Sequence, residues 1–90
     1  MYRNYYDMEA FGQELRRIRK ERQISVEHVR EYLQLESTQA IYKWESGKCF
    51  PQADTLIALC KFYDVNPMVL FGEAEASPIV ILNGYSRKVA

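Results

Sequence analysis

The chain has 90 residues, of which 48% are hydrophobic and 27% charged, and its 12 basic and 12 acidic residues balance to a net charge of zero. This composition is typical of one ordinary globular domain and excludes disordered and collagen-like chains. No run approaches the roughly 18 apolar residues of a membrane helix, and no signal peptide is visible. We therefore expect a cytoplasmic protein, and the arginine-rich stretch 16–22 provides the local positive charge that binding to nucleic acid would need.

The first predicted helix begins after Asp7, whose carboxylate can accept hydrogen bonds from the free N–H groups of the first turn. An apolar stripe at helical spacing predicts its buried face: Met8, Phe11, Leu15 and Ile18. We expect this helix to end near Arg22 or Gln23.

A second helix is predicted over 26–33, with Ser25 as its N-cap. It is too short to be stable alone, so it must pack on its neighbours. A third helix is predicted over 37–46, with Ser37 as its cap and with Ile41 and Trp44 facing inward. Gly47 then occupies the position just after the helix, where a left-handed backbone favours glycine.

Pro51 leads into a fourth predicted helix over 53–63. Its expected buried stripe consists of Ala53, Leu56, Ile57, Cys60 and Tyr63. Asn66 and Pro67 are a cap and a first-turn proline for a fifth, short helix that runs to Phe71 and ends at Gly72. The pattern therefore predicts an all-α fold, a compact bundle of five short helices over residues 8–72.

Residues 73–90 differ in composition and read as a C-terminal tail. The β-branched run 79–82 predicts a short strand, and Asn83-Gly84 after it is a hairpin signal. A strand this short is not stable alone. We expect it either to pair with the same strand of a second subunit, which we favour, or to pack back on the helices.

The two cysteines, Cys49 and Cys60, form neither a CxxC pair nor a cluster with histidine. This pattern argues against a zinc site and favours reduced thiols over a disulfide. The single histidine has no acid–base partner near it, and no glycine-rich phosphate loop is present. We therefore expect no enzymatic activity, no metal and no cofactor.

Several motifs, in this order and spacing, resemble the phage-repressor helix-turn-helix family, also called the Cro/CI or XRE family. The matching segments are Leu15-x-x-Ile18-Arg19, Ser25-Val26-Glu27, Ile41-x-x-Trp44-Glu45-x-Gly47-Lys48-x-x-Pro51 and Thr55-Leu56-x-x-Leu59-Cys60. The resemblance covers residues 11–72. It implies a lambda-repressor-like DNA-binding domain and a transcriptional regulator that acts on double-stranded DNA as a homodimer, in the cytoplasm and associated with the nucleoid.

The resemblance also implies which residues contact DNA. Helix 37–46 would read the major groove through Thr38, Gln39 and Lys43, since glutamine can bind adenine bidentately and lysine can donate to guanine. Tyr42 would touch a thymine methyl group or the backbone. Phosphate contacts are implied at Ser25, Ser46 and Lys48, the first at the N-terminus of helix 26–33. An ion pair between Arg19 and Glu45 would fix the orientation of the first helix on the third.

The chain departs from the family pattern at three positions: Val26, Arg30 and Gln34, where the family usually has glutamine, a small residue and glycine. The turn before helix 37–46 is also one residue longer. Counting from helix 26–33 instead shifts the readers to Ser37, Thr38 and Tyr42, and this alternative stays open. These departures and the zero net charge favour a second hypothesis, a protein-interaction module of antitoxin or anti-repressor type with weak DNA binding.

Overall fold

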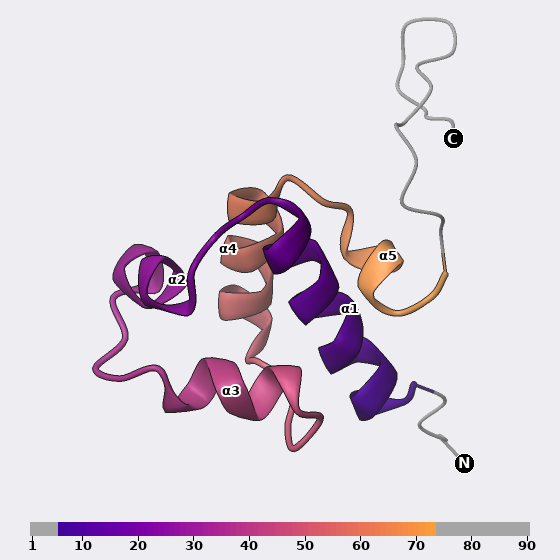
Figure 1. Cartoon of the computed structure of the whole chain (residues 1–90). Coiled ribbons are helices and arrows are strands. Elements are labelled where there is room, and N and C mark those ends of the chain that lie inside the picture. The colour runs from indigo at the N-terminus through magenta and orange to yellow at the C-terminus, as the bar shows by residue number, and fades with distance from the viewer. Residues whose placement is uncertain (1–5, 74–90) are drawn as a thin grey trace, which may run out of the picture.

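A computed structural model describes residues 6–73, and short turns join the helices of this segment (Figure 1). The helices are α1 (Met8–Glu21), α2 (Val26–Leu33), α3 (Gln39–Glu45), α4 (Ala53–Tyr63) and α5 (Pro67–Leu70). The all-α, five-helix prediction is confirmed for this part of the chain. The predicted strand 79–82 lies outside the described residues.

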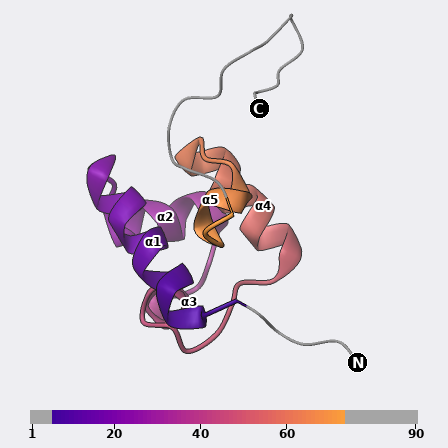
Figure 2. The same ribbon diagram turned by 90° about the vertical axis from the view of Figure 1, so that its right-hand side faces the viewer.

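The helices surround a single core, with α2 and α5 on opposite sides of α1 and α4 and with α3 across one end of α1 (Figures 1 and 2). The core is built from side chains of all five helices: Phe11, Leu15, Ile18, Val29, Ile41, Trp44, Leu59, Cys60, Tyr63, Val69 and Leu70. No helix in the described residues is long and apolar enough to cross a membrane.

The three predicted caps of α1, α2 and α5 are present. The Asp7 carboxylate accepts the N–H of Glu9 at 2.9 Å, and the Ser25 hydroxyl accepts the N–H of His28 at 3.0 Å. The Asn66 side chain likewise accepts from the N–H of Met68 at 2.9 Å. Each cap satisfies backbone donors that have no partner inside their helix. The starts of these helices therefore depend on local sequence.

The predicted start of α3 was two residues too early. The helix begins at Gln39 and ends at Glu45, with Thr38 as its N-cap residue and Ser46 as its C-cap residue. Ser37 lies one residue before the cap, where its hydroxyl accepts the N–H of Gln39 at 3.3 Å. Ser37 thus satisfies a first-turn donor, as expected of it, but it does so from the preceding turn.

The C-terminus of α3 has the predicted glycine-based stop. Gly47 has a φ of +81°, and its N–H donates to the Trp44 carbonyl at 3.2 Å. The next N–H, that of Lys48, donates to the Lys43 carbonyl at 2.9 Å. This pair of bonds is the Schellman arrangement, which ends a helix and satisfies its last carbonyls.

The predicted buried face of α4 was wrong in part. Ile57 is 56% exposed and Ala53 is also exposed, whereas Leu59, absent from the predicted stripe, is 1% exposed. Residues 56–60 contain only apolar side chains, so periodicity alone does not define one face. The contacts of α4 with α2 and α5 decide which side is buried.

We expect the two cysteines to differ sharply in reactivity. Cys60 is buried in the core, and this burial raises the pKa of its thiol, while Cys49 is exposed and the two form no disulfide. Because the thiolate is the reactive species, a thiol reagent should label one cysteine in the folded protein and both in denaturant. Mass spectrometry of labelled peptides checks this. Equal labelling rates of both thiols in native buffer would contradict the burial of Cys60.

Candidate nucleic-acid interface

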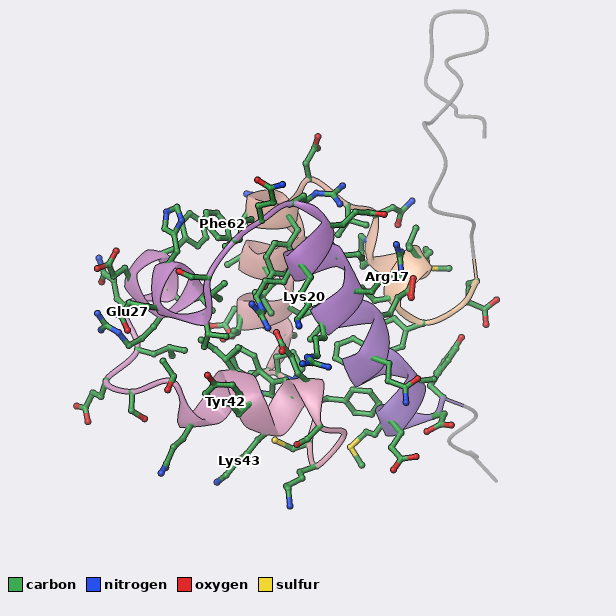
Figure 3. The ribbon with its side chains drawn as sticks, viewed as in Figure 1. Arg17, Lys20, Glu27, Tyr42, Lys43 and Phe62 are labelled. Atoms are coloured by element: carbon green, nitrogen blue, oxygen red, sulfur yellow. The ribbon has the colours of Figure 1, made fainter. Side chains whose placement is uncertain are left out.

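The helix α3 has one face locked onto the domain and one face free. Ile41, Trp44 and Glu45 are buried, and the opposite side presents exposed side chains at helical spacing: Gln39, Tyr42, Lys43 and Ser46. Tyr42 is 55% exposed although it is aromatic. In Figure 3 the Lys43 side chain points away from the body of the domain. The outward face therefore offers amide, phenol, ammonium and hydroxyl groups to a partner.

A buried ion pair holds α3 against α1. The Arg19 guanidinium donates from Nε to Glu45 Oε2 at 2.7 Å and from Nη2 to Glu45 Oε1 at 3.0 Å. Its Nη1 donates to the Ile24 carbonyl at 3.0 Å, in the loop before α2. Both residues are 8% exposed. This is the pair that the family resemblance implies, and it joins α1, the following loop and α3 at one point.

A close backbone approach also brings α1 and α3 together. Gly12 is buried, and a Cβ added there would lie 2.4 Å from the Trp44 carbonyl oxygen and 2.6 Å from that of Glu45. Only a residue without a side chain allows this contact. Sequence reasoning missed Gly12, although a glycine inside a helix costs about 1 kcal/mol relative to alanine and so points to a packing reason.

The other residues with an implied role in DNA contact lie in three places. Ser25 is exposed at the N-terminus of α2, Ser37 and Thr38 lie in the turn before α3, and Lys48 is exposed in the turn after it. The structure therefore places Ser46 and Lys48 next to the outward face of α3, whereas Ser25 belongs to a separate helix. Thr38 is half-buried, and Gln39, Tyr42 and Lys43 are all exposed. Each of the two alternative sets of predicted base-reading residues therefore includes residues that face outward.

Glutamates neutralise much of the arginine-rich stretch. Arg17 contacts Glu14 and Glu21, and the hydrogen bond with Glu14 raises the pKa of Arg17. Arg22 also contacts Glu21, at 3.4 Å. By contrast, Lys43 and Lys48 contact no carboxylate of the described residues. The lysines of α3 and its following turn are therefore available to an anionic partner.

The described residues contain no group of three or more metal-ligating side chains. The helix α3 is held firmly against the domain and exposes polar side chains on its outward face. Its chemistry suits hydrogen bonds to base edges and ionic contacts to phosphates.

A family model described as a helix-turn-helix domain matches residues 10–70 of the chain. No curated protein matches the chain significantly.

Solved structures with the same arrangement include the restriction-modification controller protein C.AhdI from Aeromonas hydrophila. It is 26% identical, with a TM-score of 0.65 over 72% of this chain and 97% of that one. The P22 c2 repressor, solved in complex with a synthetic operator, is 26% identical, with a TM-score of 0.64 over 71% and 96% of the two chains. The BldD DNA-binding domain of S. venezulae is 26% identical, with a TM-score of 0.61 over 72% and 96%.

Proposed function

The chain belongs to the helix-turn-helix domain family, and on that premise we propose that it is a sequence-specific transcriptional regulator that inserts α3 into the major groove of double-stranded DNA. An α-helix fits this groove, where each base pair presents a distinct set of donors and acceptors. Gln39 and Lys43 would read base edges, together with Thr38, and Tyr42 would contact a thymine methyl group or the backbone. Ser25, Ser46 and Lys48 would contact phosphates.

The observation that carries this proposal is the division of α3 into two faces. The inward face is anchored by Trp44 and by the buried pair of Arg19 and Glu45. On the outward face the Ser46 hydroxyl donates to the Lys43 carbonyl at 3.3 Å, but the side chains of Gln39, Tyr42 and Lys43 make no hydrogen bond or ion pair within the described part of the chain. A rigidly held helix with unsatisfied polar side chains is what readout of base edges requires. The P22 c2 repressor, which has this fold, was solved bound to an operator.

A protein-interaction module on the same fold is the second candidate. The zero net charge and the ion pairs that neutralise Arg17, Arg22 and Arg30 favour it, because a dedicated DNA-binding surface usually carries excess positive charge. In that case the exposed residues of α3 would contact a protein partner. Binding to DNA would then be weak, independent of sequence and abolished by salt.

Selection from a random duplex library at two salt concentrations tests the proposal, and Gln39→Ala is the diagnostic variant. We expect the native protein to enrich a symmetric motif and Gln39→Ala to lose one position of it. Affinity for the native motif should fall by about 1–3 kcal/mol, the usual value of a bidentate base contact. Gln13→Ala, an exposed glutamine on α1, is the matched control and should keep the motif.

Lys43→Ala separates base reading from phosphate binding in the same experiment. A relaxed motif would assign Lys43 to a base, and an unchanged motif with a salt slope smaller by about one would assign it to a phosphate. If Gln39→Ala matches the native motif at every position, Gln39 is not a reader and the alternative set of Ser37, Thr38 and Tyr42 is favoured. If the native protein enriches no motif, α3 does not read a DNA sequence. The interaction module would then be the better description.

We also propose that the protein acts as a homodimer, with residues 8–72 as the DNA-binding unit and strand 79–82 of the tail pairing between subunits. Two half-sites would then lie about one helical turn apart, roughly 34 Å. The selected motif itself reports this spacing. A monomer mass in gel filtration at high concentration would contradict the dimer without contradicting DNA binding.

A further inference from the structure

Arg30 ties α2 to the turn that precedes α3. Its guanidinium donates from Nε and Nη2 to Glu27 Oε2, at 3.0 and 2.5 Å, and from Nη1 to the Leu35 carbonyl at 3.0 Å. The N–H of Leu35 in turn donates to the backbone carbonyl of Arg30 at 3.0 Å. The Arg30 side chain therefore binds the C=O of Leu35, while the N–H of Leu35 makes the backbone bond that ends α2. The side chain of Leu35 packs against the core.

The bond between the Arg30 side chain and Leu35 lies beside a residue with a strained backbone conformation. The residue between Arg30's helix and Leu35 is Gln34, which has a left-handed φ of 59° without being glycine. Such a conformation costs free energy for a residue with a side chain. The remaining residues before α3 include no further helix or strand, and α3 itself lacks a side-chain hydrogen bond at its N-cap residue Thr38. Within the turn the Ser37 hydroxyl accepts the N–H of Gln39 at 3.3 Å, and the Arg30 side chain adds a contact from α2.

We propose that Arg30 is a positioning residue that stabilises the α2–α3 turn and so sets where the N-terminus of α3, with Gln39, meets the DNA. The C-terminal half of α3 is held independently, by Gly12 and by the ion pair of Glu45 with Arg19. The N-terminal half packs on the core through Ile41, and the turn links it to α2. A planar guanidinium can bind a carboxylate and a carbonyl at once, which the compact ammonium of lysine does less well.

The first test of this inference measures DNA binding and therefore rests on the proposed function. It compares Arg30→Ala and Arg30→Lys with Arg17→Ala, which removes a similar arginine–glutamate pair on α1 that has no bond to a backbone carbonyl. Both Arg30 variants should bind the selected motif about tenfold more weakly, a loss that corresponds to one good base contact. Binding to random duplex and the salt slope should be unchanged. Arg17→Ala should bind as the native protein does.

Arg30→Lys distinguishes positioning from a direct phosphate contact. If Arg30 touched a phosphate, lysine would keep most of the affinity, and alanine would reduce the salt slope by about one. Native affinity in Arg30→Lys, or a reduced slope in Arg30→Ala, would overturn the proposal.

Hydrogen exchange in the absence of DNA separates failure of this inference from failure of the proposed function. In Arg30→Ala the amides of residues 35–40 should exchange about tenfold faster than in Arg17→Ala, with unchanged exchange in α4. If the native protein selects no DNA sequence, the proposed function fails, yet this local acceleration would still support the role of Arg30 in the turn. Equal exchange in the two variants would overturn it.

Discussion

Replacing Gly12 with alanine is expected to destabilise the domain by roughly 2–3 kcal/mol, which is the upper range for overpacking a tightly packed site. The added Cβ would lie 2.4 Å from the Trp44 carbonyl oxygen and 2.8 Å from the Glu45 carbonyl carbon. These are backbone atoms of α3 and cannot rotate away. The last turn of α3 must therefore move away from α1, and the core contact of Trp44 would be lost with it.

The expected destabilisation by Gly12→Ala is opposite in sign to the usual effect of this substitution in a helix, so it tests the close approach of α1 and α3. In an exposed helix position, glycine to alanine stabilises by about 1 kcal/mol. Gln13 is the exposed neighbour of Gly12 on α1, so the difference between Gln13→Gly and Gln13→Ala measures that propensity in this helix. Urea denaturation of the four proteins gives the comparison. If Gly12→Ala were as stable as the native protein or more so, α1 and α3 would not approach as closely as described.

Replacing Glu45 with alanine is expected to cost about 3–5 kcal/mol, because it leaves the Arg19 guanidinium buried without its carboxylate. Both side chains are almost inaccessible to water, and the pair is made through two hydrogen bonds of 2.7 and 3.0 Å. The guanidinium of arginine keeps its proton at any pH the protein tolerates, so Arg19 cannot escape the penalty by becoming neutral when the carboxylate is removed. A domain of this size has a total stability of only about 5–15 kcal/mol.

A double-mutant cycle shows how much of this loss belongs to the pair. We expect Arg19→Met to be destabilising as well, since it leaves the Ile24 carbonyl without the guanidinium. The combination of Arg19→Met with Glu45→Leu should be far more stable than the summed losses of Arg19→Met and Glu45→Leu, each measured singly, because no buried charge remains. Additive losses in chemical denaturation would contradict a coupled buried pair. Arg17→Ala, at an exposed pair, should change stability little.

The same cycle bears on function. If the ion pair fixes the orientation of α1 on α3, the variant with both Arg19→Met and Glu45→Leu should bind the selected DNA motif less well, even where its stability is recovered. Retained affinity in a stable double variant would assign the pair to stability alone. This distinction matters because buried ion pairs contribute specificity in some proteins and not in others.

Local patterns were sufficient to predict most of the helices. The caps at Asp7, Ser25 and Asn66 and the stop at Gly47 were predicted correctly, because each is a contact between a residue and its own neighbours in sequence. The inward stripe of α1 was correct at Phe11, Leu15 and Ile18, whereas Met8, in the first turn, is only half-buried. The resemblance to the family then suggested the role that we propose for α3, and it also predicted the pairing of Arg19 with Glu45, which is present.

These local patterns did not predict other features of the structure. The buried face of α4 was misassigned at Ile57 because apolar residues lie on several sides of that helix. The start of α3 was placed too early because Ser37 accepts its hydrogen bond from outside the helix. Which glutamate pairs with each arginine, and hence which basic groups remain without a carboxylate partner, depends on side-chain geometry.

The sequence by itself therefore determined where helices form, where most of them begin and end, and the fold family to which they belong. Those properties follow from interactions over three or four residues and from a recognisable order of motifs. Only the tertiary structure decided that α1 and α3 meet at Gly12 and that Arg30 binds the turn at Leu35. The first is a contact between residues more than 30 positions apart in the chain, and the second depends on the path of an irregular turn, so neither is encoded in any local period.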